Sequence, residues 1–328
     1  EAPPQSRAHA QDFGDPPRVV VLLVQGDLVQ GDSFTVPLLG RQVTGDRTLT
    51  KEIERLRKDP SVRALVVRID SPGGDVGAAE AIARELDLVR AEKPVVISMG
   101  NTCASGGYYI ASAGQYVYAD ATTYTGSIGV FYPKVDVSGT LAKVGIGVDE
   151  QDFGRRAGLR SWMRPYDEDE RAAIQADIDA SYAVFLGRVA RARSMTTEQA
   201  DKVARGRVWS GVRAMDEGLV DDYGGVREAV LRARAIAGMR PDEGAVELLP
   251  RPTTTVENLR ALFGFDLPSP LGSDEAAASG VAIPAAVALR SVLPAGMLAV
   301  LRNLPLPLWW GDEPRVLALA DAAYVIED

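Results

Sequence analysis

Ser105 is the residue whose surroundings best suit chemistry. It lies in the run Asn101-Thr-Cys-Ala-Ser-Gly-Gly-Tyr-Tyr109. A serine hydroxyl becomes a good nucleophile only when a neighbouring base takes its proton. The single histidine of the 328-residue chain is His9, far upstream in a polar leader, so histidine is not the expected base. Because arginine stays protonated at any useful pH, the candidates are the six lysines: Lys51, Lys58, Lys93, Lys134, Lys143 and Lys202.

The elements before Ser105 alternate between strand and helix. Three apolar runs have the length of buried strands, and the stretches between them have helical spacing. Continuous apolarity predicts strands that are covered on both faces. This alternation predicts an α/β domain with a mostly parallel sheet. The expected strands are 19–24, 62–70 and 94–100, with helices from residue 48 to 58 and from residue 76 to 89.

Ser105 directly follows the third expected strand and precedes an expected helix at 106–112. Backbone N–H groups at a helix start stabilise negative charge, which suits acyl transfer. Gly106 lets the backbone approach a substrate, and Gly73 and Gly74 form a second glycine-rich turn after the previous strand. Both turns are expected at the C-terminal edge of the sheet, where α/β folds bind ligands.

A third small polar loop, Thr125-Gly-Ser-Ile-Gly129, precedes another apolar segment. Ser127 in this loop could hydrogen-bond near the site or simply cap a strand. Ser-Gly-Gly and Pro-Gly-Gly turns also close many ordinary loops, so a purely structural reading of all three turns stays open.

Four ordered motifs together resemble the signal peptide peptidase A family of bacterial serine proteases. They cover roughly residues 18–238 and read Asp70-Ser-Pro-Gly-Gly-Asp75, Ala104-Ser-Gly-Gly-Tyr-Tyr-Ile-Ala-Ser112, Thr125-Gly-Ser-Ile-Gly129, and Gly206-Arg-Val-Trp-Ser-Gly211 followed by Gly218-Leu-Val-Asp221. The resemblance implies a ClpP/crotonase-like fold of layered β-α repeats with a mostly parallel sheet and an outer helical layer.

The resemblance also implies roles for individual residues. Ser105 would be the nucleophile, and Ser127 would position a catalytic lysine. Backbone amides around Gly73, Gly74 and Gly106 would form the oxyanion hole, and no cofactor is expected. The expected activity is a Ser/Lys endopeptidase that degrades remnant signal peptides at the periplasmic face of the bacterial inner membrane, within a ring-like homo-oligomer.

This chain differs from the short form of that family at the position of the catalytic lysine. Where a Gly-x-x-Lys pattern is expected, the chain reads Phe153-Gly-Arg-Arg-Ala-Gly158, so Ala157 stands in the lysine position. Lys134 and Lys143 are nearer in sequence, but Lys143 lies in an expected helix, 137–144, facing solvent. In the long, tandem form the N-terminal copy supplies the lysine and the C-terminal copy the serine. This chain resembles the C-terminal copy, and no second copy of the motifs occurs in it.

Two other functions remain open. The chain could be a noncatalytic homologue that has lost its base and acts as an assembly or scaffold subunit. It could also be a crotonase-like acyl-CoA enzyme, because fold alone does not separate these activities. The Ser-Gly-Gly-Tyr run favours the peptidase, since crotonase-type chemistry does not require a serine there.

Composition and charge exclude some classes of partner. A net charge of −9 and a pI near 4.9 argue against a nucleic-acid surface.

Two further features have structural interpretations. Cys103, the single cysteine, cannot form an internal disulfide and is expected to be a packed small residue beside Ser105. The acidic run 167–170 opens an expected helix spanning 165–193, where it is a cap rather than a metal site.

The domain plan has three parts. Residues 1–17 are expected to be a linker or tail, residues 18–240 the peptidase domain, and residues 241–328 a C-terminal extension. No secretory signal pattern opens the chain, and no apolar run reaches the length of a membrane span. The extension carries Leu304-Pro-Leu-Pro-Leu-Trp-Trp310, which would rest on a membrane surface, a subunit or the core. Residues 315–326 are expected to add a strand.

Overall fold

The computed structural model describes residues 15–36, 41–250 and 317–319, and its centre is an eight-stranded sheet. The main path runs β10-β9-β7-β5-β1-β12, with β8 pairing with both β7 and β11. All pairs are parallel except β9 with β10. The strands are β1 (Arg18–Gln25), β5 (Val62–Ser71), β7 (Val95–Ala104), β8 (Tyr116–Ala119), β9 (Tyr124–Gly126), β10 (Val208–Ser210), β11 (Asp222–Tyr223) and β12 (Ala245–Leu249).

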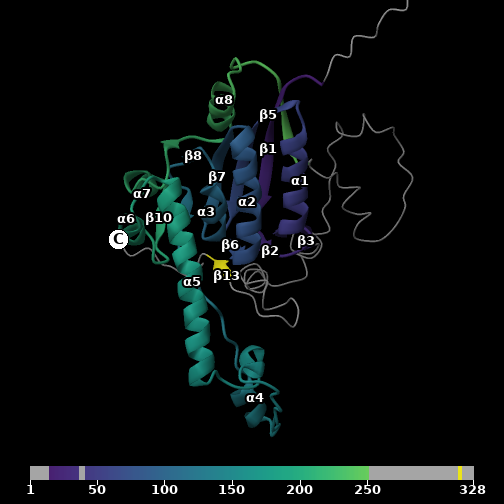
Figure 1. Ribbon diagram of the computed structural model, residues 1–328, viewed down its shortest axis with the longest axis vertical. Helices are drawn as coiled ribbons and strands as arrows, with labels where there is room; N and C mark the ends of the chain where they lie inside the picture. The colour runs from purple at the N-terminus through teal and green to yellow at the C-terminus, as the bar shows by residue number, and fades with distance from the viewer. Residues whose placement is uncertain (1–14, 37–40, 251–316, 320–328) are drawn as a thin grey trace, which may run out of the picture.

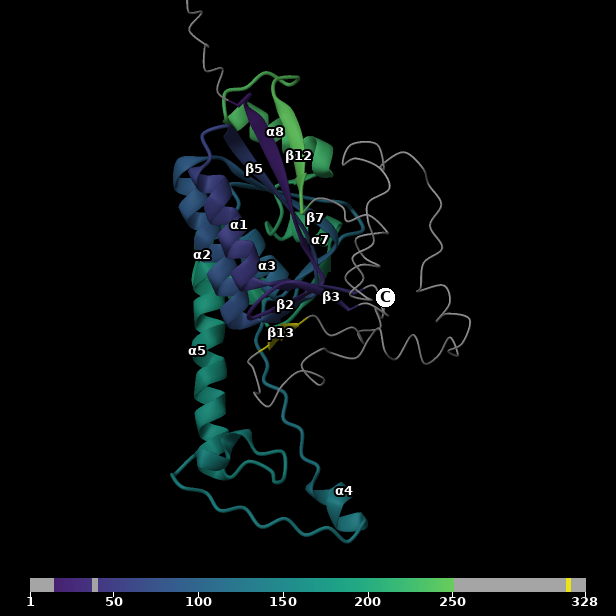
Figure 2. The ribbon, with the colours of Figure 1, turned by 90° about the vertical axis from the view of Figure 1, so that its right-hand side faces the viewer.

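Helices cover both faces of this sheet (Figure 1). One face carries α1, α2, α3 and the upper part of α5, and the other carries α8 (Figure 2). The predicted α/β fold with a mostly parallel sheet and outer helices is confirmed. The helices are α1 (Asp46–Lys58), α2 (Val76–Glu92), α3 (Gly106–Ala111), α4 (Ser138–Lys143), the 3₁₀ helix η1 (Ala157–Arg160), α5 (Glu168–Ala192), α6 (Thr197–Val203), α7 (Gly211–Asp216) and α8 (Val226–Ile236).

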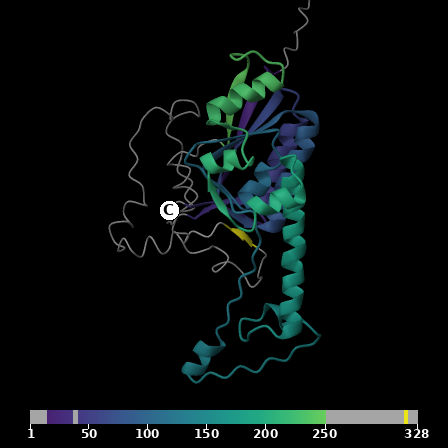
Figure 3. The same ribbon diagram turned by 90° about the vertical axis from the view of Figure 1, so that its left-hand side faces the viewer.

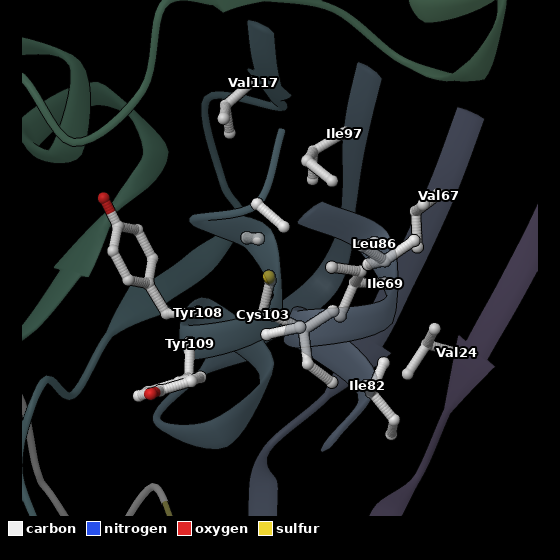
Figure 4. Close-up of a cluster of buried hydrophobic side chains, with 14 of the residues drawn as sticks. Val24, Val67, Ile69, Ile82, Leu86, Ile97, Cys103, Tyr108, Tyr109 and Val117 are labelled. Atoms are coloured by element: carbon white, nitrogen blue, oxygen red, sulfur yellow. The ribbon is translucent and has the colours of Figure 1, made fainter. Parts of the chain in front are cut away.

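The central strands are apolar without alternation because both of their faces are buried. In β1, Val20 and Leu22 pack into the core beneath α1 and α2, whereas Val19 and Val21 pack beneath α8. Cys103 is fully buried among the apolar side chains of β5, β7, α2 and α3 (Figure 4). Burial raises the pKa of its thiol, so the prediction of a packed small residue is confirmed.

A smaller five-stranded sheet lies beside the C-terminal ends of the central strands. Its order is β13-β6-β2-β4-β3, and β6 is the strand that contains Gly73 and Gly74. Residues 245–249 and 317–319, which the sequence plan assigned to the extension, add β12 to the larger sheet and β13 to this smaller one. The remaining strands are β2 (Asp27–Val29), β3 (Phe34–Val36), β4 (Arg41–Gly45), β6 (Gly73–Asp75) and β13 (Leu317–Leu319).

Residues 131–170 form an arm that projects from the body together with the first turns of α5 (Figure 3). Its α4 buries no residue, and apolar side chains on the arm face outward. Val144 is 67% exposed and Phe153 is 92% exposed. Ion pairs hold the arm instead, because the Arg164 guanidinium contacts the carboxylates of Glu150, Asp152 and Glu170.

In the described residues, no helix combines the length and the apolarity that crossing a bilayer requires. The Trp309–Trp310 pair lies outside the described residues.

Candidate active site

Three strand ends bring the glycine-rich turns together. Ser71 of β5 pairs with Cys103 of β7, and Ala104 of β7 pairs with Gly126 of β9. The residues that follow these strands therefore meet at one edge of the sheet, its C-terminal edge. The structure brings the five site residues predicted from the sequence, Gly73, Gly74, Ser105, Gly106 and Ser127, to this edge.

Ser105 sits at the sharp turn between β7 and α3. Its φ of 52° and ψ of −119° lie outside the regions that L-residues prefer. Two hydrogen bonds hold the turn: the Ser105 N–H donates to the Gly126 carbonyl at 2.8 Å, and the Tyr109 N–H donates to the Ser105 carbonyl at 2.8 Å. The side chain is fully buried, and no described group hydrogen-bonds to its Oγ. A buried hydroxyl without a partner is rare and points to a functional site.

The three glycines line the space beside Ser105. A Cβ on Gly106 would lie 3.3 Å from both the Gly73 Cα and the Gly74 nitrogen. A Cβ on Gly74, whose φ is 153°, would lie 2.2 Å from the Leu28 carbonyl oxygen. Only residues without side chains allow this close approach of the backbone segments.

Ser127 stands at the end of the neighbouring strand in a similar backbone conformation. Its φ is 48°, it is 5% exposed, and its N–H donates to the Arg207 carbonyl at 2.6 Å. One residue before Gly126, the Thr125 Oγ1 donates to the Cys103 carbonyl at 2.6 Å and ties β9 to β7. The Gly206–Gly211 motif has a structural role here, because its β10 pairs with β9.

None of the six lysines, all of which lie in described segments, hydrogen-bonds to Ser105. Lys134 donates to the Ser161 carbonyl and lies 4.3 Å from the centre of the Tyr166 ring, and desolvation lowers its pKa. Lys93 donates to the carbonyls of Leu56 and Asp59, and it precedes β7, whereas Ser105 follows that strand. The predicted solvent exposure of Lys143, at the end of α4, is confirmed.

Ala157, in the position where the family pattern has lysine, begins η1 on the arm and is exposed. Arg155 and Arg156 beside it both pair with Asp169. A guanidinium that stays protonated cannot take a proton, so neither arginine substitutes for the missing lysine. In the described part of the chain, the candidate nucleophile thus has no lysine hydrogen-bonded to it.

Sequence reasoning missed β2 as a neighbour of the site, and it predicted a strand within residues 315–326 without placing it beside Gly73 and Gly74. Leu28 of β2 pairs with Gly74, and its Cδ1 would lie 3.1 Å from a Cβ on Gly106. Strand β13 pairs antiparallel with β6, with Leu319 opposite Gly73 and Ala318 opposite Gly74. The three residues of β2 carry no local pattern that distinguishes them from a loop, and the sequence near β13 does not reveal its partner strand.

The acidic run at the start of α5 serves the helix and the arm. Asp167 caps α5 by accepting a hydrogen bond from the Glu170 N–H at 2.7 Å, so the predicted cap is confirmed. Asp169 and Glu170 pair with arginines of the arm. Within the described ranges, no group of three or more His, Cys, Asp or Glu side chains could hold a metal ion.

The profile of Peptidase family S49 matches residues 87–240, a range that includes Ser105 and Ser127. The putative protease slr0021 of Synechocystis sp. is 33% identical over 224 residues, covering 68% of this chain and 81% of that protein. The chain belongs to peptidase family S49. Another relative, the putative signal peptide peptidase SppA of Enterococcus faecium, is 30% identical over 65% of this chain and 62% of its own length. The predicted resemblance to signal peptide peptidase A is therefore confirmed.

Several relatives are much longer than this chain. The chain is 37% identical to Protease 4 of Salmonella typhi over 68% of its own length, but it spans only 35% of that relative. Among solved structures, a mutant of ClpP1 from Listeria monocytogenes gives a TM-score of 0.43 at 16% identity, covering 64% of this chain and 93% of that one.

Proposed function

We propose that this chain is the serine-bearing half of a Ser/Lys peptidase site, with Ser105 as the nucleophile. The observation that carries the proposal is the Ser105 hydroxyl, which is buried, held on a strained turn and free of any hydrogen-bond partner in the described segments. Membership of a peptidase family supports the reaction class. The base would be a lysine from an N-terminal half or another copy of the fold.

The proposed reaction needs one lysine amine in its neutral form. The Ser105 Oγ attacks the carbonyl carbon of a peptide bond while its proton moves to that amine. Amides around Gly73, Gly74 and Gly106 stabilise the oxyanion. The lysine then protonates the leaving amine, the C–N bond breaks, and water, activated by the same lysine, hydrolyses the acyl-enzyme. Ser127 would orient the lysine, because it ends the strand next to Ser105.

The substrates would be remnant signal peptides at the periplasmic face of the bacterial inner membrane. The outer edge of β6 supports an extended peptide, because β13 pairs there as an antiparallel strand beside Gly73 and Gly74. Main-chain pairing of this kind gives affinity without demanding one sequence. The apolar side chains on the arm would contact neighbouring subunits of a ring-like assembly.

Reconstitution tests the proposal. The chain is produced alone and together with a tandem copy of the fold that carries the Gly-x-x-Lys lysine, and a peptide of small and hydrophobic residues is the substrate. We expect cleavage only by the combination. Ser105→Ala should abolish that cleavage, whereas Ser181→Ala on α5 should leave it unchanged. Cleavage that survives Ser105→Ala would refute the assignment of the nucleophile.

A noncatalytic assembly subunit is the second candidate. The missing lysine at Ala157 favours it, together with the lack of a hydrogen bond from any described lysine to Ser105. A combination that assembles normally but never cleaves the peptide would favour this candidate over the peptidase.

A further inference from the structure

A solvent-open hollow of about 410 Å³ lies between α2 and α5, outside the candidate active site. Its lining includes Asp87 and Arg90 from α2, Arg188 and Arg191 from α5, and Ser112, the residue that follows α3. Ser105 precedes α3, so the hollow and the proposed nucleophile lie at opposite ends of this short helix.

The hollow is positively charged in a chain whose net charge is −9. Three guanidinium groups line it against one carboxylate, that of Asp87. Arg90 and Arg191 are exposed, and neither pairs with a carboxylate in the part of the chain that the structure describes. Arg90 Nη1 reaches only the Ala113 carbonyl, at 3.4 Å. Guanidinium groups in such numbers are the usual partners of phosphate and carboxylate groups.

Arg188 is the buried arginine of the hollow, and its hydrogen bonds fix its position. It is 9% exposed, its Nε donates to the Ser112 Oγ at 2.7 Å, and its Nη1 pairs with Asp87 at 2.9 Å. The Asp87 side chain is 44% exposed, so it can turn into solvent without unburying other groups. The Asp87 carboxylate therefore occupies a position in which a negatively charged group pairs with the buried Arg188 guanidinium.

We propose that this hollow binds the phosphate group of a small phosphorylated molecule, with Arg90 and Arg191 as its partners and Asp87 as a displaceable competitor. A phosphate carries up to two negative charges, which matches the surplus of guanidinium groups. The volume exceeds that of phosphate alone, so the group would belong to a larger molecule, either a soluble phosphate ester or an anionic phospholipid headgroup.

The test is a calorimetric titration of the full chain with inorganic phosphate. Arg90→Gln and Arg191→Gln should each weaken binding about tenfold, because each removes a charged hydrogen-bond donor. Asp87→Asn should strengthen binding, because it removes a competing negative charge. Arg227→Gln on α8 is the control: it makes the same charge change far from the hollow and should leave binding unchanged. Circular dichroism verifies that every variant folds.

Vesicles of phosphatidylglycerol, compared with phosphatidylcholine, distinguish the two sources of the phosphate group. Loss of vesicle binding in Arg90→Gln and Arg191→Gln, but not in Arg227→Gln, would assign the hollow to a lipid headgroup. If wild type binds neither phosphate up to about 20 mM, well beyond a millimolar Kd, nor anionic vesicles, the proposal is wrong. It is also wrong if the four variants bind alike. These readouts do not need Ser105 activity, so the peptidase proposal can stand or fall separately.

Discussion

Ser105 occupies a backbone conformation that costs stability. A non-glycine residue with positive φ is strained by about 1 to 3 kcal/mol. The turn keeps this geometry because two backbone hydrogen bonds, through Gly126 and Tyr109, surround it. This conformation places Ser105 at the corner between β7 and α3, directly before Gly106.

Ser105→Gly should therefore be more stable than Ser105→Ala by about 1 kcal/mol, because only glycine adopts positive φ without strain. Both variants lack the hydroxyl, so their difference isolates the backbone contribution. The measurement is the free energy of unfolding from urea denaturation. Equal stabilities would show that the turn is not strained. Both variants should lack peptidase activity in the reconstituted enzyme.

Among the elements of the fold, the arm is held in place by ion pairs because few of its apolar side chains are buried. Hydrogen bonds from Arg164 hold the pKa of the buried Glu170 carboxyl below its ordinary value of 4.5. A carboxyl with a lowered pKa in the folded arm stabilises the arm fully above that ordinary value. This stabilisation is lost as the pH falls through the lower, folded pKa.

We expect the arm to open in acid before the body does. Amide hydrogen exchange of residues 157–170, measured relative to β5 in the same sample, should accelerate as the pH falls below about 4.5. Glu170→Gln should show fast exchange in the arm already at neutral pH. Glu168→Gln is the matched control, because Glu168 is exposed and pairs with no described group. An arm unaffected by Glu170→Gln would contradict the assigned role of the ion pair.

At the scale of the whole molecule, β13 joins the smaller sheet from a distant part of the chain. It lies on the edge of β6 that a peptide substrate would need under the proposed function. Peptide and β13 would then compete for the same main-chain groups.

Ala318→Pro or Leu319→Pro should weaken the pairing of β13 with β6 and so reduce its competition with the peptide. Successive N–H groups of a strand point to opposite sides, so one of the two positions donates toward β6, and proline removes that donor. We expect one of the two variants to lower the KM for peptide several-fold, with kcat unchanged. Ala318→Gly and Leu319→Ala keep the N–H and should behave as wild type. A KM that neither proline alters would exclude a shared edge.

The sequence predicted the central layers better than the periphery. Residues 19–24 are apolar throughout and residues 64–67 are an unbroken apolar run because both faces of their strands are buried, so their pattern is strong and local. The meeting of Ser105 with Gly73 and Gly74 followed from parallel strands ending at one edge. The arm and the assembly of the smaller sheet did not follow, although a strand was expected within residues 315–326, because ion pairs and strands of three to five residues leave no periodic signal. The chemical roles of Ser105, Ser127 and the glycines stay predictions.

The pairing of β13 with β6 also sets an order of events during synthesis. Residues 317–319 leave the ribosome more than 240 residues after Gly73, so β6 lacks this neighbour while most of the chain is being made. Contacts of such long sequence separation form late and slowly. A nascent chain would therefore fold its central sheet first and present an unpaired strand edge beside Ser105 until translation reaches β13. That unpaired edge would be open to pairing with another chain during synthesis.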